Sequence, residues 1–436
     1  MHGISAAAGQ RPMHEIAVIG GGLTGLMTAT ALSFAMPAQT APRIVLIDRA
    51  AQDAVSADER TTTIHAAGAR MLSAMGVWGR LARPPAPVMR VAVAEGVPPS
   101  GLAARRRPAS DLSWQAGDSP LGYVVANHDL QAALCETIET RGVEGFRGAS
   151  VSDWQAGGGF GVLSLETAEG PRQLRAALAV ACDGARSAMA EMAGLGLREE
   201  HQQQTAIVTT LHAERHHGDT AWQRFLPGGP FALMPATATA GTGHAMSLVW
   251  TLPNAEAERL IDAEETVFEA ACLEAFGPRL GYLRLAGARL AWPLRPSWRK
   301  RISAPGLVLA GDAAHAIHPL AGQGYNLALS DAAVLADLLH ATLRRGLTAG
   351  HPSLRNAYES ARLQERLAMT GATSGLNRLF SRAPPALRRA AGIGFSVLDR
   401  LPTKSLFSDI AGGGALAEAA LLEGRLPGAA SPPPTG

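Results

Sequence analysis

Short apolar stretches separated by a glycine-rich turn dominate the first fifty residues. Residues 16–19 are all apolar and predict a buried strand, which runs directly into a turn with three consecutive glycines. Apolar residues then recur at helical spacing over 23–31, and a second strand follows at 43–48. A strand–helix–strand unit of this kind is typical of a parallel sheet covered by helices.

Later hydrophobic runs are of two kinds. Continuous apolar runs at 178–184 and 307–312 end in turns, and we expect both strands to return to the first sheet. The chain from 326 to about 422 is predicted to be mostly helical, with a clear apolar face over 326–339. Alternating runs rich in Val, Leu and Thr predict antiparallel strands of a second lobe, and they lie at 88–93, 162–165, 206–211 and 246–251.

The order of these patterns predicts an α/β fold in which a second lobe is inserted into a discontinuous first lobe. The Pro- and Gly-rich end of the chain is expected to be a disordered tail. The predicted segments are, in chain order, 1–90 (first lobe), 91–130 (second lobe), 131–200 (first lobe), 201–290 (second lobe), 291–345 (first lobe), 346–422 (helical region) and 423–436 (tail).

Composition narrows the classes of function. The chain has 436 residues, of which 47% are hydrophobic, and a formal net charge of +2, which argues against disorder and against a nucleic-acid binder. Cys135, Cys182 and Cys272 have no CxxC or Cys/His ligand spacing, so a disulfide scaffold and a structural zinc site are not expected. The apolar stretches are broken well short of the ~20 residues that a membrane-spanning helix needs.

The strongest local motif is Gly20-x-Gly22-x-x-Gly25, placed between a predicted strand and a predicted helix. Gly20 permits a tight turn, Gly22 lets a pyrophosphate approach the backbone, and Gly25 lets the helix pack close to the strand. The helix N-terminus adds free N–H groups and a partial positive charge. Asp48 closes the second strand, where a carboxylate can accept from ribose hydroxyls. The motif predicts a dinucleotide site without separating FAD from NAD; the alternative is a glycine turn without a ligand.

Two further turns follow predicted strands. Asp183 and Gly184 form the first, which taken alone is better explained as an ordinary structural turn. In the second, Asp312 lies just past a strand, at the edge where open α/β sheets bind ligands. Gly322 and Gly324 open the following helix, so that its N–H groups can approach a flat anionic ring. The alternative is that Asp312 caps a helix and the glycines form a loop.

His315 and His318 invite a metal or general-base interpretation. No further cluster of Cys, His or carboxylate residues lies near them in the sequence. We therefore interpret both histidines as structural and predict no metal site.

Taken together, the three turns in this order and at these distances resemble those of the group A flavin monooxygenases related to para-hydroxybenzoate hydroxylase. Within that group the chain is similar to the ubiquinone-biosynthesis hydroxylases over nearly its whole length, excluding both ends. The resemblance implies a Rossmann-like FAD-binding domain with an inserted antiparallel β-sheet substrate domain and a helical C-terminal region. Beyond the three turns, the stretches that carry it are 58–60, 71–78, 121–125, 224–225, 229–235, 247–250 and 322–327.

The resemblance also implies roles for individual residues. In two places the chain departs from the pattern: Asp48 stands where Glu is more usual, and Asn127 stands where many of the wider group have Arg. The implied FAD-site residues are Gly20, Gly22 and Gly25 at the pyrophosphate, Asp48 at the adenosine ribose, Arg49 beside the adenine, Arg60 near the pyrophosphate or the isoalloxazine, Asp183 in the second motif, Asp312 at the ribityl chain, and Gly322, Gly324 and Asn326 at the pyrimidine side of the flavin.

The activity implied by the resemblance is hydroxylation of the aromatic ring of a polyprenylated phenol or quinol in ubiquinone biosynthesis. NAD(P)H would reduce the FAD, and O2 would react through a C4a-hydroperoxyflavin. No residue of the sequence stands out as a catalytic base. Phe231, Leu233, Met234 and Trp250 are expected to line the substrate site, although apolar strand residues are more often plain core.

Two other functions remain open. One is an FAD-dependent reductase of similar fold, and the other is a non-catalytic flavoprotein of a lipid-biosynthesis complex. We expect a cytoplasmic protein, with peripheral association at the inner membrane as a further possibility because the implied substrate lives in a bilayer. Arg388 and Arg389, beside an apolar stripe, are the candidate contacts; the alternative is that this stripe packs on the protein's own core.

Overall fold

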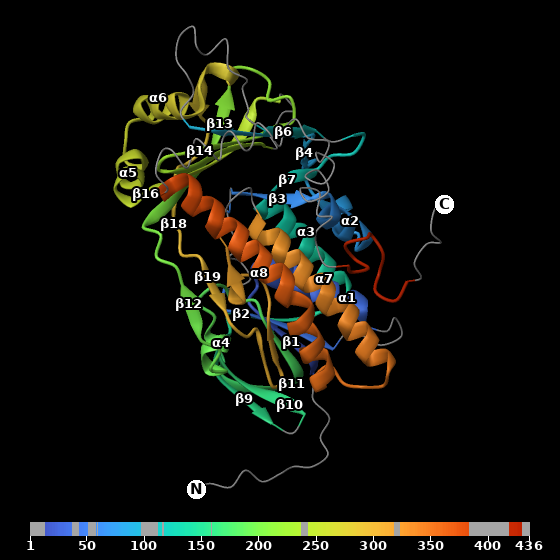
Figure 1. The fold of residues 1–436 in the computed structure, drawn as a ribbon. Helices are drawn as coiled ribbons and strands as arrows, with labels where there is room; N and C mark the ends of the chain where they lie inside the picture. The colour runs from blue at the N-terminus through green and yellow to red at the C-terminus, as the bar shows by residue number, and fades with distance from the viewer. Residues whose placement is uncertain are drawn as a thin grey trace.

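The computed structural model describes residues 14–36, 43–50, 58, 60–96, 112–115, 117–157, 159–236, 243–317, 323–382 and 418–429. For residues 323, 368–370 and 372–382 it describes the backbone alone. The described chain forms a lower lobe around a partly parallel sheet and an upper lobe around a largely antiparallel sheet (Figure 1).

The first sheet has a parallel centre in which β1 lies between β2 and β11, and β21 pairs with the other edge of β11. These strands are almost wholly buried because helices cover the sheet, which explains their continuous apolar sequences. The predicted return of 178–184 and 307–312 to this sheet is confirmed. Its parallel strands are β1 (His14–Ile19), β2 (Ile44–Asp48), β8 (Glu144–Arg147), β11 (Gly170–Ala181) and β21 (Leu307–Leu309), and β20 (Ser303–Ala304) pairs antiparallel with β21.

A hairpin extends this first sheet. Its strands β9 (Ser150–Gly157) and β10 (Phe160–Thr167) pair antiparallel, and β10 also pairs with the first half of β11. The prediction that 162–165 belongs to the second lobe is therefore wrong. Alternation shows only that one face of a strand is buried, so it cannot tell which sheet the strand joins.

Helices α1 (Leu23–Ala35), α3 (Asn127–Thr140), α7 (Gln323–Arg344) and α8 (Pro352–Arg382) lie together against the lower lobe (Figure 1). Helix α1 is buried on nearly all sides between the sheet, α3 and α7, which its apolar sequence favours. The short α4 (Ala188–Met192) follows β11, and the described helices include none that is both long and apolar enough to cross a membrane.

The second sheet forms the upper lobe. Helices α5 (Asn254–Ile261) and α6 (Glu265–Phe276) pack on one face, where Phe231, Trp250 and Phe268 form an apolar core. Its strands are β5 (Arg90–Glu95), β6 (Leu112–Gln115), β13 (Gln204–Ala213), β14 (Thr220–Leu226), β15 (Gly229–Pro235), β16 (Ala245–Pro253), β17 (Leu283–Leu285) and β18 (Leu290–Pro293).

A small sheet joins the two lobes. It consists of β3 (Thr61–His65), β7 (Gly122–Ala126) and β4 (Ala86–Val88), with α2 (Ala66–Ala74) continuing directly from β3. The Thr61 hydroxyl donates to Ser247 Oγ at 2.7 Å, and the Thr63 hydroxyl donates to the Met234 sulfur at 2.9 Å. Alternate residues of β3 therefore face the second sheet. Another three-stranded sheet contains β12 (Leu197–Glu199), β19 (Ser297–Arg299) and β22 (His315–Ala316).

The C-terminal residues differ from the predicted tail. Leu421 and Leu422 are buried in the main core, and the Ala420 amide donates to Asp337 Oδ2 at 2.7 Å. The turns at 420–424 and 427–428 continue this segment, so the disorder predicted for 423–436 is wrong for 423–429. The side chains around the basic stripe at 388–389 lie outside the described residues.

Candidate functional site

Three turns meet at the carboxyl ends of neighbouring parallel strands. Backbone hydrogen bonds hold them together: Cys182 N–H donates to Ile19 O at 2.7 Å, and Ala310 N–H donates to Ala181 O at 2.9 Å. The glycine turn after β1, the Asp183 turn after β11 and the Asp312 turn after β21 thus share one edge of the sheet. This is the place at which open α/β sheets bind ligands.

The three glycines of the first turn meet different surroundings. Gly20 has a φ of +106°, and a Cβ at Gly25 would lie only 1.7 Å from the Gly20 carbonyl oxygen, so the protein itself requires both glycines. A Cβ at Gly22 would meet no atom within 4 Å. Helix α1 begins directly after Gly22 and has neither an acidic residue in its first turn nor a side-chain cap. Its free N–H groups therefore face open space suited to a phosphate.

Carboxylates surround this turn. Asp48 lies against Gly21, where a Cβ would come within 2.2 Å of its Oδ2, and it pairs with Arg147 at 3.2 Å. Asp183 Oδ2 accepts a hydrogen bond from the Met189 amide at 3.3 Å, whereas its Oδ1 is buried without a partner. That unpartnered oxygen can accept from a ligand hydroxyl.

Asp312 lies in a short 3-10 turn, η4 (Gly311–Ala313), directly after β21, and its side chain is exposed. Dense protein around it nevertheless desolvates the carboxyl and raises its pKa, while His315 acts in the opposite direction. Because the Asp312 carboxylate is surrounded by protein but still reaches solvent, it is available to a ligand.

The first turn of α7 is tied to the small sheet rather than left free. Asn326 Nδ2 donates to the Thr63 carbonyl at 2.8 Å, and its Oδ1 accepts from the His65 amide at 3.1 Å. Asn326 therefore fixes the start of α7 against β3. Gly324 lies in the same turn, whereas Gly322 lies outside the described residues. Flavin contacts of these residues stay a prediction.

The two arginines predicted at the flavin have different environments. Arg49 is exposed directly after β2. Arg60 pairs with Asp58 at 2.7 Å and its guanidinium lies 4.9 Å from the ring centre of Trp292 in β18. Asn127, the departure from the family pattern, donates to the same Asp58 at 2.9 Å. Arg60 thus links the first lobe to the second sheet, and its contact with a flavin stays a prediction.

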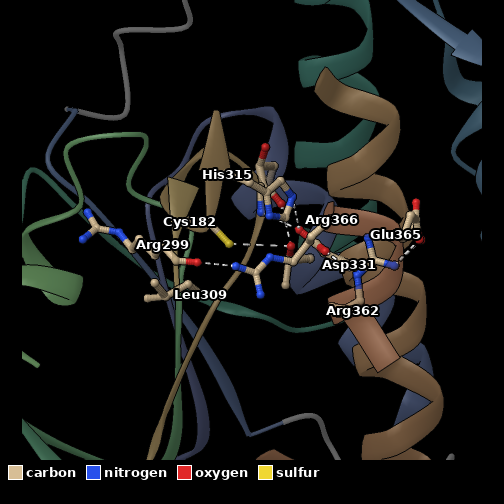
Figure 2. Close-up of polar contacts among 12 residues, drawn as sticks. Cys182, Arg299, Leu309, His315, Asp331, Arg362, Glu365 and Arg366 are labelled. Carbon is tan, nitrogen blue, oxygen red and sulfur yellow. Dashed lines mark hydrogen bonds and ion pairs between the residues drawn. The ribbon is translucent and has the colours of Figure 1, made fainter. Parts of the chain in front are cut away.

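A buried charge network supports the Asp312 turn from behind (Figure 2). Asp331 of α7 is fully buried; its Oδ2 accepts from the Gly311 amide at 2.8 Å, and its Oδ1 accepts from Arg362 Nε of α8 at 2.6 Å. His315 Nε2 lies 3.1 Å from Asp331, and Arg362 also pairs with Glu365. His315 therefore has a structural partner, as its sequence context predicts.

The charge state of Asp331 follows from its neighbours. Burial alone would raise the pKa of this carboxyl, but His315, Arg362 and the Gly311 amide outweigh it and lower the pKa to about 2. Asp331 is thus ionised at neutral pH and holds the Gly311 amide in place.

Arg299 holds two of the three turns from another side. This fully buried arginine of β19 donates through Nε to the Ala313 carbonyl at 2.9 Å, and through its other nitrogens to the carbonyls of Leu195 and Ala185. Sequence reasoning missed Arg299, Asp331 and Arg362. Two arginines and an aspartate at separate, otherwise ordinary positions give no local signal.

A cavity of about 100 Å³ lies between the small sheet and the second sheet. Strand β15 contributes Ala232 and Met234 to it, whereas Phe231 and Leu233 point to the opposite face, into the core with α5 and α6. Trp250 belongs to that same core and packs against Phe231. Of the four residues expected to line the substrate site, only Met234 lines this cavity.

Comparison with known proteins indicates that the cofactor is FAD. A family model described as FAD binding domain matches residues 13–372. The chain belongs to this family. The three turns described above fit FAD: the space at Gly22 suits a pyrophosphate, and Asp183 offers an unpartnered acceptor.

Several relatives cover most of the chain. Ubiquinone hydroxylase UbiL of Rhodospirillum rubrum is 35% identical, with 90% of this chain and 88% of that protein covered. The 3-demethoxyubiquinol 3-hydroxylase of Escherichia coli is 30% identical, with 88% and 95% covered. The human ubiquinone biosynthesis monooxygenase COQ6 is 26% identical, with 87% and 89% covered. The predicted resemblance is confirmed: the chain is an FAD-dependent hydroxylase of the group that includes the ubiquinone-biosynthesis hydroxylases.

Solved structures agree on the fold. The p-nitrophenol 4-monooxygenase PnpA of Pseudomonas putida superimposes with a TM-score of 0.72 at 18% identity, covering 92% of this chain and 97% of that one. PqsL of P. aeruginosa gives 0.68 at 19% identity, covering 87% and 98%. The predicted fold class, a Rossmann-like domain carrying an inserted sheet, is confirmed.

The different surroundings of Gly22 and Gly25 lead to a test of the FAD site. Gly22→Val should leave the folded apoprotein intact, because its side chain enters open space, but weaken FAD binding by at least about 100-fold by filling the phosphate position. Thermal unfolding of the apoprotein and fluorescence titration with FAD measure the two effects. Gly25→Ala is the contrasting variant and should destabilise the apoprotein itself. Unchanged FAD affinity in Gly22→Val would contradict the assignment.

A second test concerns Asp331. Asp331→Asn removes the main counter-charge of Arg362 and should cost about 3 kcal/mol of unfolding free energy at pH 7, with Glu365 limiting the loss. Urea unfolding measures it, and the exposed Asp153→Asn is the control, with a change within about 0.5 kcal/mol.

The pH dependence of this effect has a definite sign. Because folding lowers the pKa of Asp331 from 3.8 to about 2, its stabilisation is present above about pH 4 and is lost as the pH falls toward 2. The difference between wild type and Asp331→Asn should shrink over that range. Equal stability of the two proteins at pH 7 would show that the network does not support the fold.

Proposed function

We propose that this FAD-dependent hydroxylase acts on the aromatic ring of a polyprenylated phenol or quinol in ubiquinone biosynthesis, with O2 as oxidant and NAD(P)H as electron donor. The observation that carries the proposal is a mainly apolar cavity whose wall, β3, is tied by Asn326 to the helix that opens the flavin site. The relatives' names support the substrate class. Bound FAD would supply the redox chemistry, activating O2 for transfer of one oxygen atom to the ring.

We assign FAD binding and substrate binding to different lobes. The lobe around the first sheet binds FAD, and the lobe around the second sheet, with the small sheet, holds the substrate. In the FAD site we assign contacts to Gly20, Gly22, Gly25, Asp48, Arg49, Arg60, Asp183, Asp312, Gly322, Gly324 and Asn326.

The cavity suits an aromatic ring. Its volume of about 100 Å³ is of the order of the ~150 Å³ that encloses benzene in an engineered protein cavity. Val88, Val91, Leu121 and Met234 provide apolar contacts and keep water away from the ring. Ala232 leaves room on the side of β15. Phe231, Leu233 and Trp250 support this wall from the core behind it.

His65 is the titratable side chain among the described residues that line this cavity. It is buried and lies on the same face of β3 as Thr61 and Thr63, whose hydroxyls both bond to the second sheet. We assign it to accept the proton of the substrate hydroxyl: the O–H bond breaks, the proton moves to an imidazole nitrogen, and the oxygen enriches the ring in electrons for attack on activated oxygen. The Asn326–His65 backbone contact fixes this strand next to the flavin-site helix.

The proposed reaction has a direct test in cells and with purified protein. Cells lacking the protein should accumulate an under-hydroxylated polyprenyl phenol or quinol when grown with O2, as seen by mass spectrometry of extracted lipids. With purified holoenzyme and that lipid, isotopic label from O2 should appear in the product. Label from water would contradict the proposal. Turnover without O2 would instead favour a reductase, and FAD binding without turnover a non-catalytic flavoprotein.

The proton-acceptor role predicts a specific effect of His65→Gln. Loss of a general base should lower kcat for hydroxylation by about 100-fold. FAD binding and substrate-stimulated NAD(P)H oxidation should persist, with hydrogen peroxide formed instead of product. The exposed His201→Gln is the matched control. Wild-type kcat and an unchanged pH profile in His65→Gln would exclude the role.

A further inference from the structure

A second cavity, of about 350 Å³, lies at the end of the upper lobe near α6. Its walls come from the start of β5, the end of β6, the loop between β13 and β14, and the 3-10 turn η3 (Pro278–Leu280). The side chains that matter are Arg90, Arg215, His216, His217, Trp222 and Arg279. None of the described residues lining the cavity is an aspartate or a glutamate.

Arg90, Arg215 and Arg279 lie in the cavity wall, and no described aspartate or glutamate lines the cavity with them. Arg279 lies 4.6 Å from the ring centre of Trp222, and Arg215 donates to the Arg279 carbonyl at 3.3 Å. Burial, with a further effect of the Arg90 charge, lowers the pKa of Arg279. Like charges held close together favour an anion between them, and guanidinium groups match phosphate oxygens in geometry.

Both histidines accept a backbone amide at Nδ1. The Gly218 amide donates to His216 Nδ1 at 2.9 Å, and the Asp219 amide donates to His217 Nδ1 at 3.0 Å. In the neutral ring, an Nδ1 that accepts leaves the proton on Nε2. Burial lowers the pKa of His217, although Asp219 opposes this effect. The Nε2 edge of His216 lies against Gly243, so the histidines shape the cavity wall.

Trp222 contributes its ring to the cavity wall. Its side chain is 9% exposed, and its indole N–H makes no hydrogen bond. Because that N–H is itself buried from solvent, we assign only the ring to the cavity. Nearby carboxylates are engaged elsewhere: Glu214 accepts from the Tyr282 amide, and Asp219 lies 3.6 Å from His217 Nδ1, on the side away from Nε2.

We infer that this cavity binds a phosphate-bearing anion. Arg90, Arg215 and Arg279 offer guanidinium donors from several sides, and a phosphate or diphosphate group carries enough acceptor oxygens to use them. The phosphate can belong to a soluble phosphate ester or to a phospholipid headgroup. The inference stands independently of the proposed hydroxylation.

Calorimetric titration of the FAD-loaded protein with pyrophosphate at low salt tests the site. We expect saturable binding that is weakened at least about tenfold in Arg90→Gln/Arg279→Gln, because two charge-assisted contacts are lost. Arg259→Gln, an exposed arginine of α5 on the same lobe, is the matched control and should bind like wild type. FAD content and hydroxylation of a soluble phenol should be unchanged in all variants.

Vesicles distinguish the two sources of phosphate. Co-sedimentation with phosphatidylglycerol vesicles but not phosphatidylcholine vesicles, lost in the double variant, would identify an anionic phospholipid headgroup. Pyrophosphate binding without vesicle binding would identify a soluble phosphate ester. Absence of pyrophosphate binding in wild type, or equal binding in wild type and the folded double variant, would overturn the inference.

Discussion

The buried pair of Asp331 and Arg362 is the interaction on which the cofactor site depends most. Its two charges come from α7 and α8, and the carboxylate also accepts the amide of Gly311, directly before Asp312. Separating these partners would leave charge inside the protein, which costs far more than an exposed ion pair contributes. The Asp312 turn, the two long helices and β21 are therefore held in one arrangement (Figure 2).

Helix α7 also fixes the position of the small sheet. Five residues before Asp331, Asn326 bonds to the backbone on both sides of Ile64 in β3. Strand β3 in turn bonds to the second sheet through Thr61 and Thr63. The first turn of α7, which we propose to contact the flavin, and β3, which we propose to line the substrate site, are thus fixed relative to each other through a few buried polar contacts.

Features formed by residues close together in the sequence could be predicted, whereas contacts between distant residues could not. The glycine turn, its helix and Asp48 form a local unit, and the continuous apolar runs mark parallel strands because only strands buried on both faces tolerate such sequences. Arg299 could not be predicted, because its carbonyl partners at 185, 195 and 313 come together only in the folded chain. Strand β15 is buried throughout, so its sequence could not tell that Met234 faces the cavity and Phe231 the core.

Two cavities with different linings lie along one strand of the upper lobe. Trp222 of β14 lines both cavities: the one toward β3 is mainly apolar with one titratable residue, and the one near α6 is lined by cations and donors. An aromatic side chain can serve both, because its ring packs against apolar groups while its face takes Arg279. The side chain of Trp222 thus stands between the cationic groups and the mainly apolar cavity, in which we propose that the substrate ring reacts.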